Sequence, residues 1–227
     1  DLDSWVLQIQ GPTSLDVLEV VCDMSIDDFP YYGVAEVDIN GDSFYISRSG
    51  WTGERGFEIY SKNSDFDGVK LWNFLLEKGS PAGLMPSDVS SMHIRRIEAG
   101  ILDYGTDIDQ SLNPFEIGLE RLVHLDKVDF IGRKALMETN HKSLRLKGLL
   151  CGETSLTRGD KLLDSGKEIG FVSAGAWSPY LESGVGLIRL NETKPSDHRV
   201  KVVTSSGEFD AKVVDLPLYD KEKLLVR

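Results

Sequence analysis

The chain has 227 residues, of which 41% are hydrophobic and 27% are charged, a composition typical of a soluble globular protein. Its formal net charge of −12 repels nucleic acid and anionic lipid, and its Lys and Arg residues form no stripe, so we set nucleic-acid binding aside. No apolar run approaches the roughly 20 residues that span a bilayer, so we expect no membrane partner.

The cysteines indicate the redox environment of the protein, and the first residue indicates where the chain begins. Cys22 and Cys151 lie far apart, and neither has a Cys or His at metal-ligand spacing. We therefore predict two buried, reduced thiols in a cytoplasmic protein. The chain opens on Asp1, with no initiator Met and no signal-like start, so we expect that an N-terminal portion is missing.

A strand and a helix are predicted first in chain order. Apolar and polar residues alternate over residues 5–10, which indicates a half-buried strand, and Gly11 and Pro12 end it. Ser14 is expected to cap a helix over residues 15–22, because a Ser hydroxyl can accept from the free N–H groups of a first helical turn.

A hairpin and a third strand follow. Residues 34–39 and 44–47 are extended runs, and Asn40 and Gly41 lie between them. Both residue types tolerate a positive φ, so this pair favours a tight turn. A further strand is predicted over residues 57–60.

Helical spacing of apolar residues predicts four more helices. Gly79 and Gly100 are expected to end the first two, and Pro86 with Ser87 is expected to open the second. The four helices are predicted near residues 66–78, 86–99, 116–122 and 134–139.

After His141 the pattern changes to short extended runs separated by Gly turns. Such regular short strands predict a small all-β barrel. We therefore expect an α+β fold of two domains, residues 1–141 and a C-terminal β-barrel over 142–227. The predicted strands of the barrel are residues 147–150, 169–173, 185–190, 200–204 and 209–214.

The glycine-rich segment over residues 50–56 could suggest a phosphate-binding loop. It lacks the Gly-Lys-Ser/Thr ending of such loops and any basic residue placed to reach a β-phosphate. We interpret it as a turn in which the backbone approaches another group closely, which glycine permits. A functional role and a plain hairpin loop stay equally open on this pattern.

Glu58 interrupts an apolar run between Phe57 and Ile59. Because a strand alternates its faces, Glu58 and Tyr60 should point the same way, opposite those two neighbours. A buried carboxylate there would need hydrogen-bond donors, and the two parallel N–H groups of a pterin or guanidine-like ligand would match it. Spacing alone favours the alternative, a solvent-facing Glu on an amphipathic strand.

Trp51 lies in the glycine-flanked turn. A large aromatic residue in a loop is either an anchor over the core or a stacking platform for a ligand, and the sequence leaves both open. For a sulfonium or ammonium ligand, the ring would add about 1–2 kcal/mol of cation–π attraction.

Other charged residues have structural explanations. Arg95, Arg96 and Glu98 have the composition of a structural salt-bridge set. The acidic loop over residues 103–109 lacks the full ligand pattern of a Ca²⁺ loop, and the histidines are scattered. We therefore predict no metal site, and spacing supports no catalytic triad.

Seven groups of short motifs occur in order along nearly the whole chain. Together they resemble the aminomethyltransferase (glycine-cleavage T protein) superfamily, although each is weak alone. They are LQIQGP at 7–12, TGE and GFEI at 52–59, RIEAG at 96–100, YG with Asp at 104–107, NPFE at 113–116, FIG and AL at 130–136, and GFVS with SP at 170–179.

This resemblance implies a folate-dependent one-carbon transferase with tetrahydrofolate as cofactor. The family's fold is a three-domain ring around a central folate channel, ending in a β-barrel. Its members begin well before this chain does, which agrees with the expected truncation. The implied partners are a small-molecule one-carbon donor or a lipoyl carrier protein.

Departures from the motifs indicate one branch of the superfamily. Met92 stands where glycine-cleavage enzymes carry an Arg, and Trp51 stands where they usually carry a Tyr. Trp51, Ile97, the run at 113–116 and the LPLY ending at 216–219 are more similar to the dimethylsulfoniopropionate demethylase branch. We therefore expect a protein most like such a demethylase, with a true aminomethyltransferase and a non-catalytic folate-binding protein as alternatives.

The resemblance also leads to a predicted set of site residues. In the demethylase branch, the residues that match Trp51 and Tyr60 are implicated at the sulfonium and methyl-transfer site, so these two are the predicted catalytic residues. The residue that matches Glu58 is implicated at the folate pterin. The predicted cofactor-binding residues are Glu58, Arg96 and Trp177.

Overall fold

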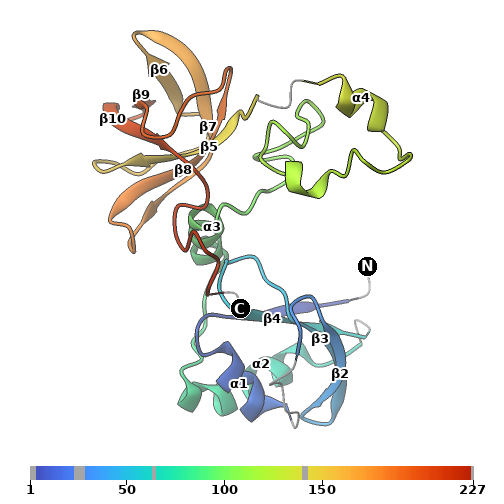
Figure 1. Cartoon of the computed structure of the whole chain (residues 1–227). Coiled ribbons are helices and arrows are strands. Elements are labelled where there is room, and N and C mark those ends of the chain that lie inside the picture. Colours follow the sequence, from blue (N-terminus) through green and yellow to red (C-terminus); the bar gives the residue numbers. More distant parts are fainter. Residues whose placement is uncertain (1–3, 23–28, 63–64, 140–142, 226–227) are drawn as a thin grey trace. The chain divides into compact units, whose positions relative to one another are not determined.

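The computed structural model describes residues 4–22, 29–62, 65–139 and 143–225. The chain forms two compact units, residues 1–95 with 222–227 and residues 96–221 (Figure 1). Its mixed helices and sheets followed by an antiparallel barrel confirm the predicted α+β class. The predicted domain boundary near residue 142 lies outside the described residues and stays a prediction.

The first unit contains a four-stranded antiparallel sheet in the order β1-β4-β3-β2. Its helices α1 and α2 lie on one side of that sheet in Figure 1. The elements in chain order are β1 (Val6–Gln10), α1 (Ser14–Val21), β2 (Val34–Ile39), β3 (Asp42–Ser47), β4 (Gly56–Ser61), α2 (Gly68–Gly79), the 3-10 helix η1 (Ser80–Ala82) and α3 (Val89–Glu98), whose last residues belong to the second unit.

The central strand β4 shows the expected alternation of faces. Phe57 and Ile59 are each 1% exposed and belong to the hydrophobic core that α1 and α2 complete. Glu58 and Tyr60 are half-buried on the other face. Burial of each large apolar side chain contributes about 1.5–3 kcal/mol, so this pattern fixes which face of the strand points away from the helices.

The predicted hairpin between β2 and β3 is confirmed. Asn40 has φ 55° and Gly41 has φ 88°, two consecutive positive values that match a tight primed turn. The Gly41 N–H donates to the Asp38 carboxylate at 2.9 Å, which closes the turn.

The predicted cap at Ser14 is wrong. Helix α1 already begins at Ser14, and the preceding Thr13 makes no side-chain cap hydrogen bond. The Ser14 hydroxyl instead donates to the Arg55 carbonyl at 3.1 Å, so tertiary contact with the loop before β4 overrides capping.

Helix α3 begins later than predicted. The Asp88 carboxylate accepts from the backbone N–H groups of Ser90 at 2.9 Å and Ser91 at 3.2 Å. An Asp satisfies first-turn donors in this way, so Asp88 rather than Pro86 or Ser87 sets the start of the helix.

The helix predicted over residues 116–122 is also wrong. In that range the structure has only the 3-10 helix η2 (Glu120–Leu122). Gly118 has φ 74°, a left-handed conformation that interrupts an α-helix, and this explains the difference.

The second unit contains a closed six-stranded barrel with the strand order β10-β5-β8-β7-β6-β9. Five strands were predicted, and the missed strand β6 is a four-residue piece that pairs with β7 and β9. The elements after η2 are α4 (Arg133–Met137), β5 (Leu146–Cys151), β6 (Lys161–Asp164), β7 (Lys167–Ser178), β8 (Ser183–Leu190), β9 (Arg199–Thr204) and β10 (Gly207–Val214).

A buried ion pair ties the end of α3 to the barrel within the second unit. Arg96 is 3% exposed and Asp107 is 0% exposed, and Arg96 Nη1 donates to Asp107 Oδ2 at 2.7 Å. The Ser173 hydroxyl of β7 donates to the other oxygen, Asp107 Oδ1, at 2.7 Å. This network satisfies charged groups that would otherwise be costly to bury.

Both cysteines are buried and free, as predicted. Burial raises the pKa of the Cys22 thiol to about 12, so this side chain stays protonated and packs as an apolar group. Among the described residues, no helix is both long enough and apolar enough to cross a membrane.

We predict that Asp107→Ala lowers the free energy of unfolding by about 3 kcal/mol, because it removes the buried carboxylate that pairs with the Arg96 guanidinium. Urea denaturation followed by circular dichroism measures this loss. The control is Asp210→Ala, which removes an exposed partner of Lys201 and should cost less than about 1 kcal/mol. Equal losses in the two variants would contradict a special role for the buried pair.

Candidate functional site

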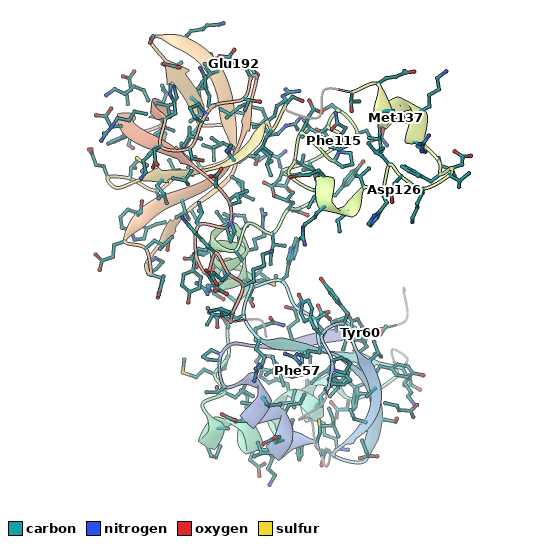
Figure 2. The ribbon with its side chains drawn as sticks, viewed as in Figure 1. Phe57, Tyr60, Phe115, Asp126, Met137 and Glu192 are labelled. Atoms are coloured by element: carbon teal, nitrogen blue, oxygen red, sulfur yellow. The ribbon has the colours of Figure 1, made fainter. Side chains whose placement is uncertain are left out.

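Three polar side chains form a row across neighbouring strands of the first unit. The register places Gln8 of β1 opposite Glu58 of β4, and Glu58 opposite Ser47 of β3. Tyr60 lies on the same face of β4, and Figure 2 labels it together with Phe57, which lies on the other face. The row is therefore on the face of the sheet that points away from the apolar core.

The carboxylate of Glu58 accepts three side-chain hydrogen bonds. Gln8 Nε2 donates to Oε1 at 3.1 Å, and the Tyr60 hydroxyl donates to Oε2 at 2.9 Å. The Ser49 hydroxyl, from the segment just after β3, also donates to Oε2. Glu58 is thus held in one orientation by donors, unlike a freely rotating surface carboxylate.

A second hydroxyl extends this arrangement. Ser47 Oγ and Ser49 Oγ are 2.7 Å apart. Because Ser49 donates to Glu58, the proton between the two serines comes from Ser47, which gives a chain of donors from Ser47 through Ser49 to the carboxylate. Such chains polarise one another and strengthen each hydrogen bond.

The Gln10 side chain lies close to two glycines, Gly50 in the loop between β3 and β4 and Gly56 at the start of β4. A Cβ added at Gly50 or Gly56 would lie 2.1 Å from Gln10 Oε1. The Gln10 amide donates to the Ser49 carbonyl at 3.3 Å and accepts from the Thr52 hydroxyl at 2.9 Å. The close approach predicted for this loop is therefore made to a side chain of β1.

Trp51 is half-buried in the same loop. Its predicted part in holding a cationic donor stays a prediction, as does its alternative role as an anchor.

The surroundings of Tyr60 favour the protonated phenol. Burial raises the pKa of Tyr60, and the hydrogen bond to Glu58 and the negative charge of that carboxylate raise it further. The phenol is therefore a hydrogen-bond donor at neutral pH and is poorly suited to act as a base.

A pocket of about 590 Å³ lies along β1 in the first unit. Gln8 lines it and also donates to Glu58, so the pocket and the carboxylate share one side chain. Its volume is in the range of small-molecule sites. Other lining residues include Gln10, Thr52, Glu54, Trp72, Met85, Met92 and Arg95.

The other predicted cofactor-binding residues belong to the second unit. The Arg96 guanidinium is buried and engaged with Asp107 and with the Ile101 carbonyl, at 3.1 Å. Trp177 is 39% exposed on β7. The structure brings Glu58 and Tyr60 together, while a role of Arg96 and Trp177 in binding a cofactor stays a prediction.

Gln8, Ser49 and Ser47 were not predicted as neighbours of Glu58. Gln8 had a signal, because it is a polar residue in the alternating run that also carries Ile9. The two serines had none, since their contact with Glu58 depends on the pairing of β3 with β4.

Carboxylates of the acidic loop over residues 103–109 contact other residues of the second unit. Asp109 pairs with Arg189 at 2.7 Å, and Asp103 accepts from the Thr106 hydroxyl at 2.6 Å. Within the described ranges, no group of three or more His, Cys, Asp or Glu residues is placed to hold a metal ion.

Comparison with known proteins identifies both parts of the chain. The model of the GCVT N-terminal domain matches residues 2–127, and the model of the glycine cleavage T-protein C-terminal barrel domain matches residues 145–220. The second match coincides with the β-barrel.

Relatives match over nearly the full chain. An aminomethyltransferase of Halothermothrix orenii is 35% identical over 93% of this chain, and one of Thermotoga neapolitana is 35% identical over 96%. The crystal structure of the glycine cleavage system aminomethyltransferase T from Bartonella henselae has a TM-score of 0.80 at 25% identity and covers 96% of this chain. The chain spans about 60% of the length of each of these proteins.

We predict that Glu58→Ala lowers the pKa of Tyr60, because it removes the acceptor and the negative charge beside the phenol. The pKa should stay above its ordinary value, since burial persists. Carbon-13 NMR of the tyrosine ζ carbons during a pH titration measures the change, and Tyr60→Phe assigns the signal among the seven tyrosines. Glu36→Ala is the control, because Glu36 bonds Lys62 and Ser43 instead. An unchanged Tyr60 pKa in Glu58→Ala would contradict the contact.

Proposed function

Because this chain belongs to the glycine cleavage T-protein family, we propose that it is a tetrahydrofolate-dependent one-carbon transferase acting on an aminomethyl group. The support is that relatives at 35% identity are named aminomethyltransferase. We also propose a lipoyl carrier protein as the source of the group. Methyl transfer of the demethylase kind, which the departures from the family motifs favour, is the second candidate.

The observation that carries the proposal is the oriented carboxylate of Glu58. A pterin presents two parallel N–H groups, and a carboxylate accepts such a pair through its two oxygens with charge-assisted hydrogen bonds. The three donors to Glu58 are neutral side chains, so the carboxylate keeps its negative charge for a ligand. A fixed orientation also lowers the entropic cost of binding.

The residues around Glu58 suit a reaction that depends on positioning. Holding the folate N5 in line with an activated carbon converts an encounter of two molecules into a step within one complex. Glu58 would fix the pterin and Tyr60 would donate a hydrogen bond at neutral pH. Gln8 also lines the 590 Å³ pocket along β1, whereas Glu58 and Tyr60 are not among the residues that line it.

We predict that Glu58→Ala weakens tetrahydrofolate binding at least about tenfold, because hydrogen bonds to a charged group contribute about 1.5–3 kcal/mol. Isothermal titration calorimetry with the wild-type and variant proteins measures the dissociation constant. Glu36→Ala on β2 serves as the matched control, since it removes another hydrogen-bonded carboxylate from the same sheet. Normal binding by Glu58→Ala would refute the assignment of this carboxylate.

A second candidate function is methyl transfer from a sulfonium donor, as in the dimethylsulfoniopropionate demethylase branch. Two residues favour it. Met92 lines the pocket in place of the Arg of glycine-cleavage enzymes, which removes a positive charge that would repel a cationic donor. Trp51 could hold the cation through its ring, with about 1–2 kcal/mol of attraction.

Turnover with two donors separates the candidates. We expect conversion of tetrahydrofolate with an aminomethyl-lipoyl carrier protein and none with dimethylsulfoniopropionate, measured by mass spectrometry of the folate product. The opposite result would make the sulfonium reaction the function. Folate binding without turnover of either donor would support a non-catalytic folate-binding protein.

A further inference from the structure

The two oxygens of Glu58 differ in their remaining capacity to accept hydrogen bonds. Each carboxylate oxygen offers about two lone-pair sites. Oε2 already accepts from Ser49 and Tyr60, whereas Oε1 accepts from Gln8 alone. A ligand with two parallel N–H groups therefore finds a free site on Oε1 and none on Oε2. One donor must leave before both N–H groups can bind.

Ser49 is fixed by more than its bond to Glu58. Its hydroxyl is 2.7 Å from that of Ser47, and its carbonyl accepts from Gln10 at 3.3 Å. Loss of the Ser49 bond would break the donor chain that begins at Ser47. Gln8 lies directly opposite Glu58 in the ladder and bonds the other oxygen, so its departure would free nothing on Oε2.

Tyr60 is the donor that can leave at the lowest cost. Its hydroxyl lies at the end of a long side chain on the half-buried face of β4 and reaches Glu58 from two residues along the same strand. A small rotation of the side chain would move the hydroxyl off Oε2, and water or a ligand could then accept its hydrogen bond. Neither Ser49 nor Gln8 would need to move.

We propose that a ligand with paired N–H groups displaces the Tyr60 hydroxyl from Glu58, while Ser49 and Gln8 remain as positioning residues. This inference rests on the proposed binding of a folate pterin to Glu58. Its consequence is an order of events: the Tyr60 hydroxyl becomes available as a donor to a bound group only after folate has bound. The Tyr60 hydroxyl thus donates to Glu58 before folate binds and is free to donate to another bound group afterwards.

The first test compares the sign of two affinity changes. Tyr60→Phe keeps the ring and removes the competing donor, so tetrahydrofolate should bind about two- to tenfold more tightly. Gln8→Ala removes a donor to Oε1 that stays in the complex and frees nothing on Oε2, so binding should weaken by a similar factor because the carboxylate is held less firmly. Ser43→Ala is the control, because Ser43 donates to Glu36 at 3.0 Å and should leave the affinity unchanged. Weaker binding by Tyr60→Phe, or tighter binding by Gln8→Ala, would overturn the proposal.

The second test follows Tyr60 itself in the intact protein. Saturation with tetrahydrofolate should move the tyrosine ζ-carbon signal of Tyr60 toward its position in the free Glu58→Ala protein, since the contact with the carboxylate is lost in both. A Tyr60 signal that does not move on saturation would overturn the displacement.

Folate binding at Glu58 and displacement of the Tyr60 hydroxyl would be refuted by different results. If the wild-type protein binds no tetrahydrofolate, or if Glu58→Ala binds it normally, the proposed function fails and the displacement with it. If Glu58 is required but the two affinity changes have the opposite signs, the displacement alone is refuted.

Discussion

The pairing register of β1 with β4 is the constraint on which the candidate site depends. Leu7 and Ile9 of β1 face the same core as Phe57 and Ile59, and a slip of one residue would turn them to the other face. Burial of these side chains therefore selects one register. The same register places Gln8 opposite Glu58, so the polar row is a consequence of how the apolar face packs.

The strand β1 organises the site twice. Gln8 bonds the carboxylate, and two residues later Gln10 fills the space between Gly50 and Gly56 and bonds the loop that carries Thr52. Any side chain at either glycine would displace the Gln10 amide. Contacts with Gln10 therefore account for two of the glycines that make this segment resemble a phosphate-binding loop.

Most of the framework could be predicted because it depends on local patterns. Alternation identified the strand around Glu58, and Asn40 with Gly41 identified the turn of the hairpin. The strand β6 was missed because four residues carry too little periodicity, and the helix near residue 116 failed because Gly118 adopts a positive φ. The local pattern of apolar and polar residues predicts helices and strands that are long enough to show a period, but it does not predict short strands or backbone conformations such as that of Gly118.

Ser49 as a partner of Glu58, and Asp107 as the partner of Arg96, were not predictable, because these contacts join separate segments of the chain. Ser49 reaches Glu58 through strand pairing, and Arg96 meets Asp107 through the fold of the second unit.

The choice between branches of the family also could not be made from single residues. Trp51 and Met92 are single departures, whereas the similarity to aminomethyltransferases extends over 93% of the chain at 35% identity. Whole-chain similarity therefore outweighs the two residues in ranking the donors.

The neutrality of the donors around Glu58 explains how the site could be selective. Two cations of the first unit are paired with other carboxylates, Lys62 with Glu36 and Arg95 of α3 with Glu54. Because Glu58 is held by hydroxyl and amide groups, exchanging the Tyr60 hydroxyl for a ligand N–H changes the free energy little. The gain comes from the N–H that takes the free site on Oε1, and the parallel N–H that replaces the Tyr60 hydroxyl on Oε2 fixes the orientation of the ligand. A carboxylate arranged in this way therefore selects for the geometry of paired donors and depends less on the total charge of the ligand.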